Sequence, residues 1–139
     1  MDTPSSAPAH VSTTPDKAYF TQESDYSYAG IHLLLEFWQA KHLDDIAVAR
    51  QALIDAVEAA EATLLDLSLH RFSPYGGFSG VAVLSESHIS IHTWPELGYA
   101  AIDIFTCGNA KPHKAIPVLK AAFEPANVQL VEHRRGMML

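Results

Sequence analysis

The chain has 139 residues, of which 48% are hydrophobic and 18% are charged, and its formal net charge is −7. This length and composition fit one globular domain with one hydrophobic core, and they exclude a disordered or collagen-like chain. A single cysteine excludes an intramolecular disulfide. No apolar run approaches the roughly 20 residues of a membrane span, and the acidic balance argues against a nucleic-acid partner. No secretory signal opens the chain, so we expect a cytoplasmic protein.

Residues 1–27 differ in composition from the rest of the chain. They are rich in proline, serine and threonine, and they contain no leucine or isoleucine. Such a segment buries too little apolar surface to offset the entropy of ordering it. We therefore expect a disordered tail over 1–27 and a folded domain over 28–139. The alternative is an arm that docks on a partner subunit through Tyr19, Phe20 and Tyr26.

Hydrophobic periodicity predicts the elements of the domain in chain order. Continuous or alternating apolar runs predict strands, and apolar residues three and four apart predict helices. The expected strands cover 32–38, 63–72, 81–84, 87–93, 99–105 and 128–133. The expected helices cover 43–60 and 114–123, and Pro117 fits the second helix only within its first turn.

We summarise this order as β-α-β-β-β-α-β, with one strand free to merge or split. Hairpin-length links between the middle strands predict a mostly antiparallel sheet with the helices on one face. The expected fold class is therefore α+β, a two-layer sandwich. Such a sheet has exposed edges and one bare face, which favours a homodimer.

The segment 76–108 concentrates the residues that can carry chemistry. Eight histidines are many for this length, and two of them lie here with several serines, carboxylates and the only cysteine. A first interpretation is a metal site with His88, His92 and Cys107 as ligands, because residues four apart in a strand share a face. The spacing matches no known zinc signature, so this interpretation rests on the residue types alone. The same three residues could instead form a non-catalytic metal-binding module.

Two further interpretations are catalytic. Cys107 could be a nucleophile with His92 as its base, oriented by Asp103 or Glu96. Alternatively, the chain could process itself between Glu86 and Ser87. A serine hydroxyl can attack the preceding carbonyl to form an ester, and elimination and hydrolysis then leave a pyruvoyl group. Residue types alone do not separate these interpretations.

The stretches SESHISIHTWPE and GYAAIDIFTCG resemble the processing and active-site segment of the small, pyruvoyl-dependent prokaryotic S-adenosylmethionine decarboxylases. The stretches GIHLLLEFW, HRFSPYGGFSG and VEHRRG are also similar to that family. The resemblance covers about residues 29–136, and its main motif is long and contiguous, so it is far more specific than a short pattern.

The resemblance implies a proenzyme that cleaves itself between Glu86 and Ser87, into a β chain (1–86) and an α chain (87–139). Ser87 would become the pyruvoyl group, which forms a Schiff base with the substrate. His92 would accept a proton during processing and Ser79 would assist it. Cys107 would donate the proton that replaces carbon dioxide.

The implied reaction converts S-adenosylmethionine to S-adenosylmethioninamine and carbon dioxide for spermidine biosynthesis. The alternative is the same chemistry on arginine or ornithine. Aromatic faces suit adenine and a sulfonium cation, so Phe72 and Trp94 are candidates for binding the substrate, and Glu96 could accept ribose hydroxyls. The resemblance assigns no metal ligand, and it implies a homodimer of αβ units or a larger assembly.

One geometric point conflicts with these roles. Ser87 and His92 are five residues apart, so a regular strand would place their side chains on opposite faces. Either a bend or bulge near Ser87 or the freedom of a newly made chain end is needed to bring them together.

Overall fold

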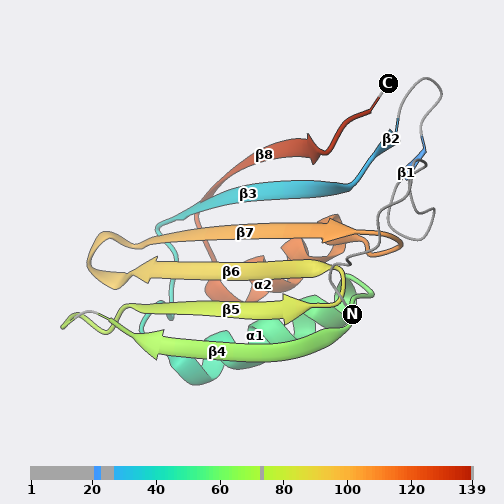
Figure 1. The fold of residues 1–139 in the computed structure, drawn as a ribbon. Helices are drawn as coiled ribbons and strands as arrows, with labels where there is room; N and C mark the ends of the chain where they lie inside the picture. The colour runs from blue at the N-terminus through green and yellow to red at the C-terminus, as the bar shows by residue number, and fades with distance from the viewer. Residues whose placement is uncertain (1–20, 23–26, 73, 139) are drawn as a thin grey trace.

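The computed structural model describes residues 21–22, 27–72 and 74–138. A six-stranded sheet, with strand order β4-β5-β6-β7-β3-β8, forms one layer (Figure 1). Every neighbouring pair of strands in it is antiparallel. Its strands are β3 (Gly30–Trp38), β4 (Leu64–Arg71), β5 (Phe78–Leu84), β6 (Ser87–Trp94), β7 (Tyr99–Cys107) and β8 (Asn127–Arg135).

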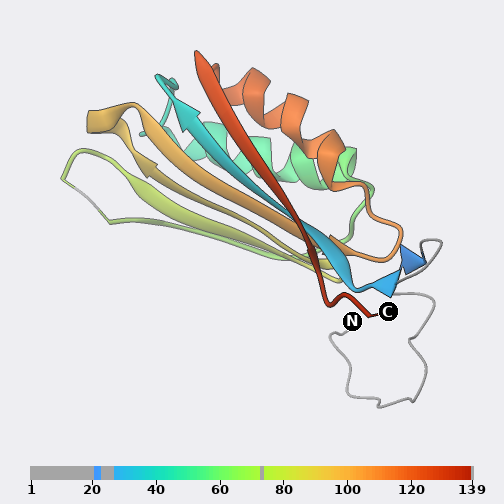
Figure 2. The ribbon, with the colours of Figure 1, turned by 90° about the horizontal axis from the view of Figure 1, so that it is seen from above.

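Two α-helices, α1 (Ile46–Ala59) and α2 (Ala115–Phe123), form the second layer. Figure 2 shows both on the same side of the sheet. The predicted α+β two-layer sandwich is therefore confirmed, and the four middle strands stay separate. Single 3-10 turns, η1 (Pro95–Leu97) and η2 (Pro112–Lys114), precede β7 and α2. Neither described α-helix is long and apolar enough to cross a membrane.

A small second sheet lies before β3. It pairs β1 (Thr21–Gln22) with β2 (Ser27–Tyr28). Ser27 also exchanges two backbone hydrogen bonds with Met138, of 2.9 and 2.8 Å, which join β2 to the end of the described chain. The rest of the predicted tail, including the candidate docking residues Tyr19, Phe20 and Tyr26, lies outside the described residues.

Strand alternation places the hydrophobic core between the sheet and the helices. Within β3, Leu33, Leu35 and Phe37 are buried toward the helices. The buried residues of α1 recur at the three- and four-residue spacing of one helix face. Asp45 caps that helix by accepting a hydrogen bond from the Val48 N–H. The helix α2 begins at Ala115, so Pro117 lies in its first turn, where its missing N–H costs no helical hydrogen bond.

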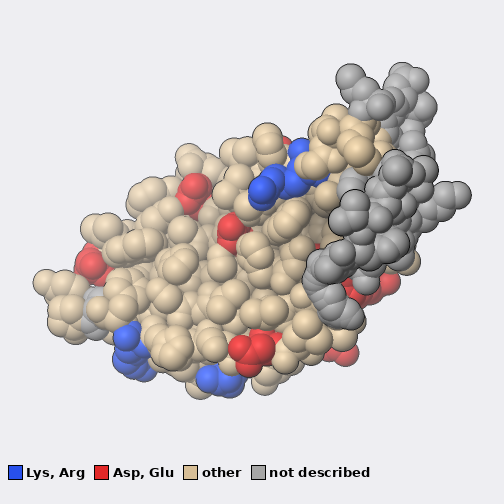
Figure 3. Space-filling view, viewed as in Figure 1, with Lys and Arg blue, Asp and Glu red and all other residues tan. Residues whose placement is uncertain are grey.

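No helix or strand of the described residues covers the other face of the sheet. We call it the open face. Most of the surface visible in Figure 3 belongs to residues other than lysine, arginine, aspartate and glutamate. The open face carries the alternate residues of each strand, which on β3 are His32, Leu34, Glu36 and Trp38. It is therefore the side of the sheet that can present polar groups to a ligand or a partner.

Candidate active site

The connection between β5 and β6 is a two-residue turn, Ser85–Glu86, followed by a strained serine. Ser87 has a φ of 139°, a region that residues other than glycine rarely adopt. Hairpins commonly place glycine where the backbone needs a positive φ. The backbone is thus distorted at Ser87 itself, but β6 pairs with β5 and β7 without a register shift from Ser87 to His92. The bend or bulge expected to bring these two side chains together is therefore not found.

The carbonyl of Glu86 is held by the end of β7. The backbone N–H of Cys107 donates to the Glu86 oxygen at 2.9 Å. The register that pairs Ser87 with Thr106 brings these two elements together. A backbone N–H aimed at a carbonyl oxygen polarises that carbonyl and can stabilise an oxyanion formed there. The carbonyl of the peptide bond that the resemblance predicts to be cleaved therefore already has a hydrogen-bond donor, the Cys107 N–H.

The Cys107 side chain is half-buried and hydrogen bonded to the Ser87 hydroxyl. Burial raises the pKa of the Cys107 thiol above its ordinary value, the Ser87 hydrogen bond opposes that rise, and the negative charge of Glu86 adds to it. The net direction is upward, which keeps the thiol protonated at neutral pH. A protonated thiol can donate a proton, whereas it is a poor nucleophile.

Ser79 and His92 form a second pair on the open face. They lie opposite each other on β5 and β6, and Ser79 Oγ is 2.9 Å from His92 Nδ1. The pair borders a shallow cavity of about 160 Å³, which is also lined by Ser68, His70 and Ser90. His92 is exposed, so its ring can reach a group outside its own chain.

The two pairs lie at different places on β6. Ser87 begins the strand, and His92 is five residues further along it. At about 3.3 Å per residue, this separates their backbones by about 16 Å. One chain therefore brings Ser87 to Cys107 and Ser79 to His92, and it does not bring His92 to Ser87.

The predicted substrate residues lie near one end of the open face. Phe72 and Trp94 meet edge to face, with ring centroids 6.2 Å apart. Tyr99 stacks on Trp94 at 5.2 Å and on Trp38 at 4.4 Å, so four aromatic rings form a row. Glu96 lies in η1 and is exposed. Sequence reasoning missed Tyr99 and Trp38, because only the pairing of β3 with β7 places them in this row.

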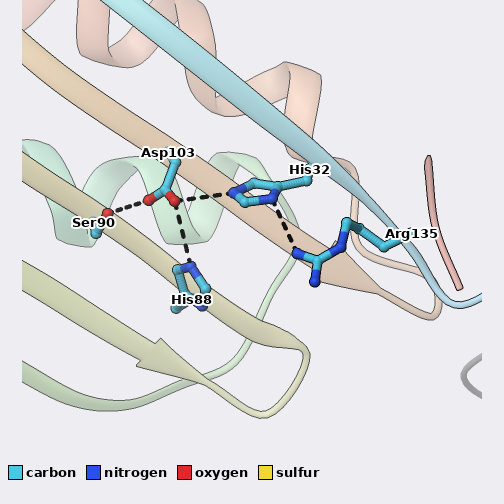
Figure 4. A network of polar contacts seen from close by, with 5 residues as sticks. All are labelled: His32, His88, Ser90, Asp103 and Arg135. Atoms are coloured by element: carbon cyan, nitrogen blue, oxygen red, sulfur yellow. Dashed lines mark hydrogen bonds and ion pairs between the residues drawn. The ribbon is translucent and has the colours of Figure 1, made fainter. Parts of the chain in front are cut away.

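A polar network crosses the open face between β3, β6 and β7 (Figure 4). The Asp103 carboxylate accepts hydrogen bonds from His32 Nε2, at 2.9 Å, and from the Ser90 hydroxyl. His88 Nε2 lies 3.8 Å from the same carboxylate. The pKa of Asp103 lies well below its usual range, mainly because of His88 and further because of Ser90 and His32. Burial opposes this shift. Asp103 is therefore a carboxylate at any physiological pH.

His32, His88 and Asp103 are the one group of metal-ligating side chains gathered within the described part of the chain. The ligand set expected from the sequence, His88 with His92 and Cys107, is not among such groups. Arg135 Nη1 lies 3.3 Å from His32 Nδ1, and an arginine can only donate. His32 Nδ1 therefore accepts, and its Nε2 carries the proton given to Asp103, so both ring nitrogens of His32 are already used in hydrogen bonds.

Comparison with known proteins shows which family this sequence matches. The sequence profile of the S-adenosylmethionine decarboxylase family matches residues 31–136. An S-adenosylmethionine decarboxylase proenzyme from Thermomicrobium roseum is 49% identical over 111 residues, which are 79% of this chain and 96% of the relative. A proenzyme of the same name from Thermotoga maritima is 48% identical over 110 residues, which are 77% of this chain and 84% of the relative.

The fold has a solved counterpart as well. The crystal structure of the adenosylmethionine decarboxylase from Aquifex aeolicus aligns with a TM-score of 0.72 at 33% identity, covering 79% of this chain and 92% of that one. The fold of this chain thus has a solved relative in the same enzyme class as its sequence relatives. The chain belongs to the S-adenosylmethionine decarboxylase family.

Proposed function

We propose that this chain is a proenzyme that cleaves itself between Glu86 and Ser87 and then decarboxylates S-adenosylmethionine. The products would be S-adenosylmethioninamine and carbon dioxide, the first of which supplies aminopropyl groups for spermidine. Family membership supports the reaction. The observation that carries the cleavage site is the Glu86 carbonyl, which accepts the Cys107 N–H directly before the strained Ser87. The expected cytoplasmic location stays a prediction.

Self-cleavage begins with attack of the Ser87 hydroxyl on the Glu86 carbonyl carbon. The Cys107 N–H stabilises the negative charge that develops on the carbonyl oxygen. The carbon–nitrogen bond then breaks, which leaves an ester on Oγ and a free amine on Ser87. A base removes the Ser87 α-proton, and Glu86 departs as a carboxylate. Water hydrolyses the remaining enamine, ammonia leaves, and the α chain begins with a pyruvoyl group.

The base in this scheme is His92, held by Ser79 at 2.9 Å. Because His92 and Ser87 of one chain are about 16 Å apart along β6, the base must come from a second copy. A two-fold axis that crosses the strands would set the end of one β6 opposite the start of the other. We therefore propose a homodimer that packs open face to open face, in which each cleavage site uses Ser79 and His92 of the other copy.

The pyruvoyl group supplies an electron sink for the electrons released when carbon dioxide leaves. The residues around it supply the proton and the binding surface. Cys107, already in contact with residue 87, would give its thiol proton to the substrate carbon. Phe72 and Trp94 offer aromatic faces to the adenine and the sulfonium, and Glu96 offers acceptors to the ribose hydroxyls.

Denaturing mass spectrometry tests the cleavage. The purified chain should give two masses, for residues 1–86 and 87–139, and the smaller chain should lack a free amino terminus. The Ser87→Ala variant should give one intact mass. A single intact mass for the unaltered chain would exclude self-cleavage. Release of labelled carbon dioxide from S-adenosylmethionine, with none from arginine or ornithine, tests the substrate.

A further inference from the structure

Thr63, which immediately precedes β4, holds the turn that carries the proposed cleavage site. Its backbone N–H donates to Glu86 Oε1 at 2.9 Å, and its hydroxyl donates to Glu86 Oε2 at 3.3 Å. Its carbonyl accepts the Ser85 N–H at 3.0 Å. Both residues of the turn are therefore bonded to a residue more than twenty positions earlier in the chain.

Glu86 is consequently fixed from two directions. Thr63 holds its carboxylate on the β4 side, and the Cys107 N–H holds its carbonyl on the β7 side. Because both the carbonyl oxygen and the side chain of Glu86 are hydrogen bonded, its carbonyl has little freedom to rotate. The peptide bond between Glu86 and Ser87 therefore has a defined orientation against the Ser87 side chain.

The φ of Ser87 determines where its Cβ lies relative to the Glu86 carbonyl carbon. Around the Cα of an L-residue, Cβ stands about 120° from the residue's own carbonyl carbon. A φ of 139° therefore leaves Cβ only about 20° from eclipsing the Glu86 carbonyl carbon. In an ordinary strand or helix, Cβ points away from that carbon.

An eclipsed arrangement is what the first step of self-cleavage requires. Attack of Oγ on the preceding carbonyl carbon closes a five-membered ring through Cβ, Cα and N of Ser87. Such a ring closes only when Cβ and the carbonyl carbon lie on the same side of the N–Cα bond. The outlying φ is unfavourable, and such a conformation persists only where its surroundings impose it. The bonds to Glu86 are surroundings of this kind.

We propose that Thr63 is a positioning residue for self-cleavage, which holds the Glu86–Ser87 peptide in the ring-closing conformation through the Glu86 carboxylate. This inference rests on the proposed cleavage between these two residues. Thr63 itself touches neither reacting atom, so it acts only through Glu86. Its effect should therefore appear in the rate of cleavage and should depend on the Glu86 side chain.

The test follows the first-order rate of cleavage in freshly translated chain, by denaturing electrophoresis. Thr63→Val keeps the shape and the N–H but loses the hydroxyl, so we expect cleavage about three- to tenfold slower. Thr63→Ser restores the hydroxyl and should restore most of the rate. Glu86→Ala loses both side-chain bonds and should slow cleavage at least tenfold. Thr63→Val should add nothing to Glu86→Ala, because its partner is then absent.

Two controls separate positioning from folding. Gln51→Ala removes a hydrogen bond of 2.9 Å to Asp55 on α1, away from the turn, and should leave the rate unchanged. Thermal unfolding in the uncleavable Ser87→Ala background should show that Thr63→Val remains folded. The inference is wrong if Thr63→Val cleaves at the rate of the unaltered chain, or slows Glu86→Ala by the same factor. If the unaltered chain itself does not cleave, the proposed function fails as well.

Discussion

Ser79 Oγ lies 2.9 Å from His92 Nδ1, across two strands that meet on the open face. In the tautomer in which Nδ1 donates to Ser79, the lone pair of His92 resides on Nε2 and is free to accept a proton. The serine then fixes both the tautomer and the orientation of the ring. In the proposed function, this pair supplies the general base.

Removal of either member should slow self-cleavage, by different amounts. His92→Ala removes the proton acceptor and should slow cleavage about 10²- to 10⁴-fold. Ser79→Ala removes only the orientation and should slow it about tenfold. Ser68→Ala, which alters another hydroxyl of the same cavity, serves as the matched control and should cleave normally. Equal rates for Ser79→Ala and Ser68→Ala would argue against this role. Time-resolved denaturing electrophoresis measures all three rates.

A mixture of two inactive chains tests whether the site is shared between copies. Ser87→Ala retains Ser79 and His92 but cannot be cut, whereas His92→Ala retains Ser87 and Cys107 but has no base. In a mixed dimer, the His92 of the first chain would face the Ser87 of the second. Co-expression should therefore give cleaved His92→Ala chain, while each variant alone stays intact.

Mass spectrometry identifies which chain was cut in this mixture, because the two variants differ in mass. Cleavage of the His92→Ala chain only in the presence of Ser87→Ala would support the shared site. Failure of the mixed dimer to cleave, with dimer formation confirmed by size-exclusion chromatography, would contradict it. A Ser87→Ala/His92→Ala double variant is the control partner, because it can form the same dimer but supplies no base.

Local sequence pattern predicted the elements, and it failed where distant strands meet. Continuous or alternating apolar runs located every large strand, and helical spacing located α1 and α2, because each pattern depends on neighbours within a few residues. The spacing of Ser87 and His92 predicted a bend or bulge that would bring them together, whereas β6 is regular between them and only the φ of Ser87 is unusual. No local pattern could place His32 beside Asp103, 71 residues away, because register is set only when β3 enters the sheet.

The same limit applies to Thr63 and to the separation of the Ser79–His92 pair from Ser87. Thr63 is an exposed polar residue before a strand, and nothing in its neighbourhood reveals the contact with Glu86. Family resemblance grouped Ser87 with His92 by role, whereas the structure separates them along β6. Roles carried over from relatives state which residues take part, and they do not state which copy of the chain supplies each one.

The Asp103 network should make stability depend on pH. The pKa of Asp103 is lowered in the folded chain, mainly by His88, so ionised Asp103 favours the folded state. This contribution is complete above the ordinary aspartate pKa of 3.8 and declines as the pH falls below it toward the folded value. Asp103→Asn should therefore lose about 2 kcal/mol of unfolding free energy at pH 7. The difference should shrink below pH 3.8.

Urea unfolding of both proteins at pH 7 and at acidic pH measures this difference. The uncleavable Ser87→Ala background keeps each sample a single chain, so that two-state analysis applies. Glu61→Gln is a useful comparison, since the pKa of Glu61 is also lowered, by Lys111 and Lys114, but at an exposed site. It should change stability far less. Equal effects of the two substitutions would indicate that the Asp103 network contributes no more than a surface ion pair.

The Cys107 thiol should titrate above its ordinary pKa of 9.0, because burial penalises the thiolate. The pH dependence of the rate of alkylation by iodoacetamide reports this pKa, since only the thiolate reacts. Accessibility scales the rate at every pH, so it does not move the midpoint of the rate–pH curve. We expect a midpoint above 9.0 in uncleaved Ser87→Ala chain. A midpoint near 7 would mean that the thiolate is favoured, as in a cysteine nucleophile.

The negative charge of Glu86 is a second cause of the raised pKa of Cys107, and it can be tested separately. Glu86 raises the pKa of Cys107 through its negative charge, so Glu86→Gln in the Ser87→Ala background should shift the alkylation midpoint downward. In the mature enzyme, the protonated thiol is the proposed donor, and it persists at every pH below the raised pKa. Turnover should therefore not decline near neutral pH on account of Cys107. Cys107→Ser should lower turnover about hundredfold, because an alcohol is a much weaker acid.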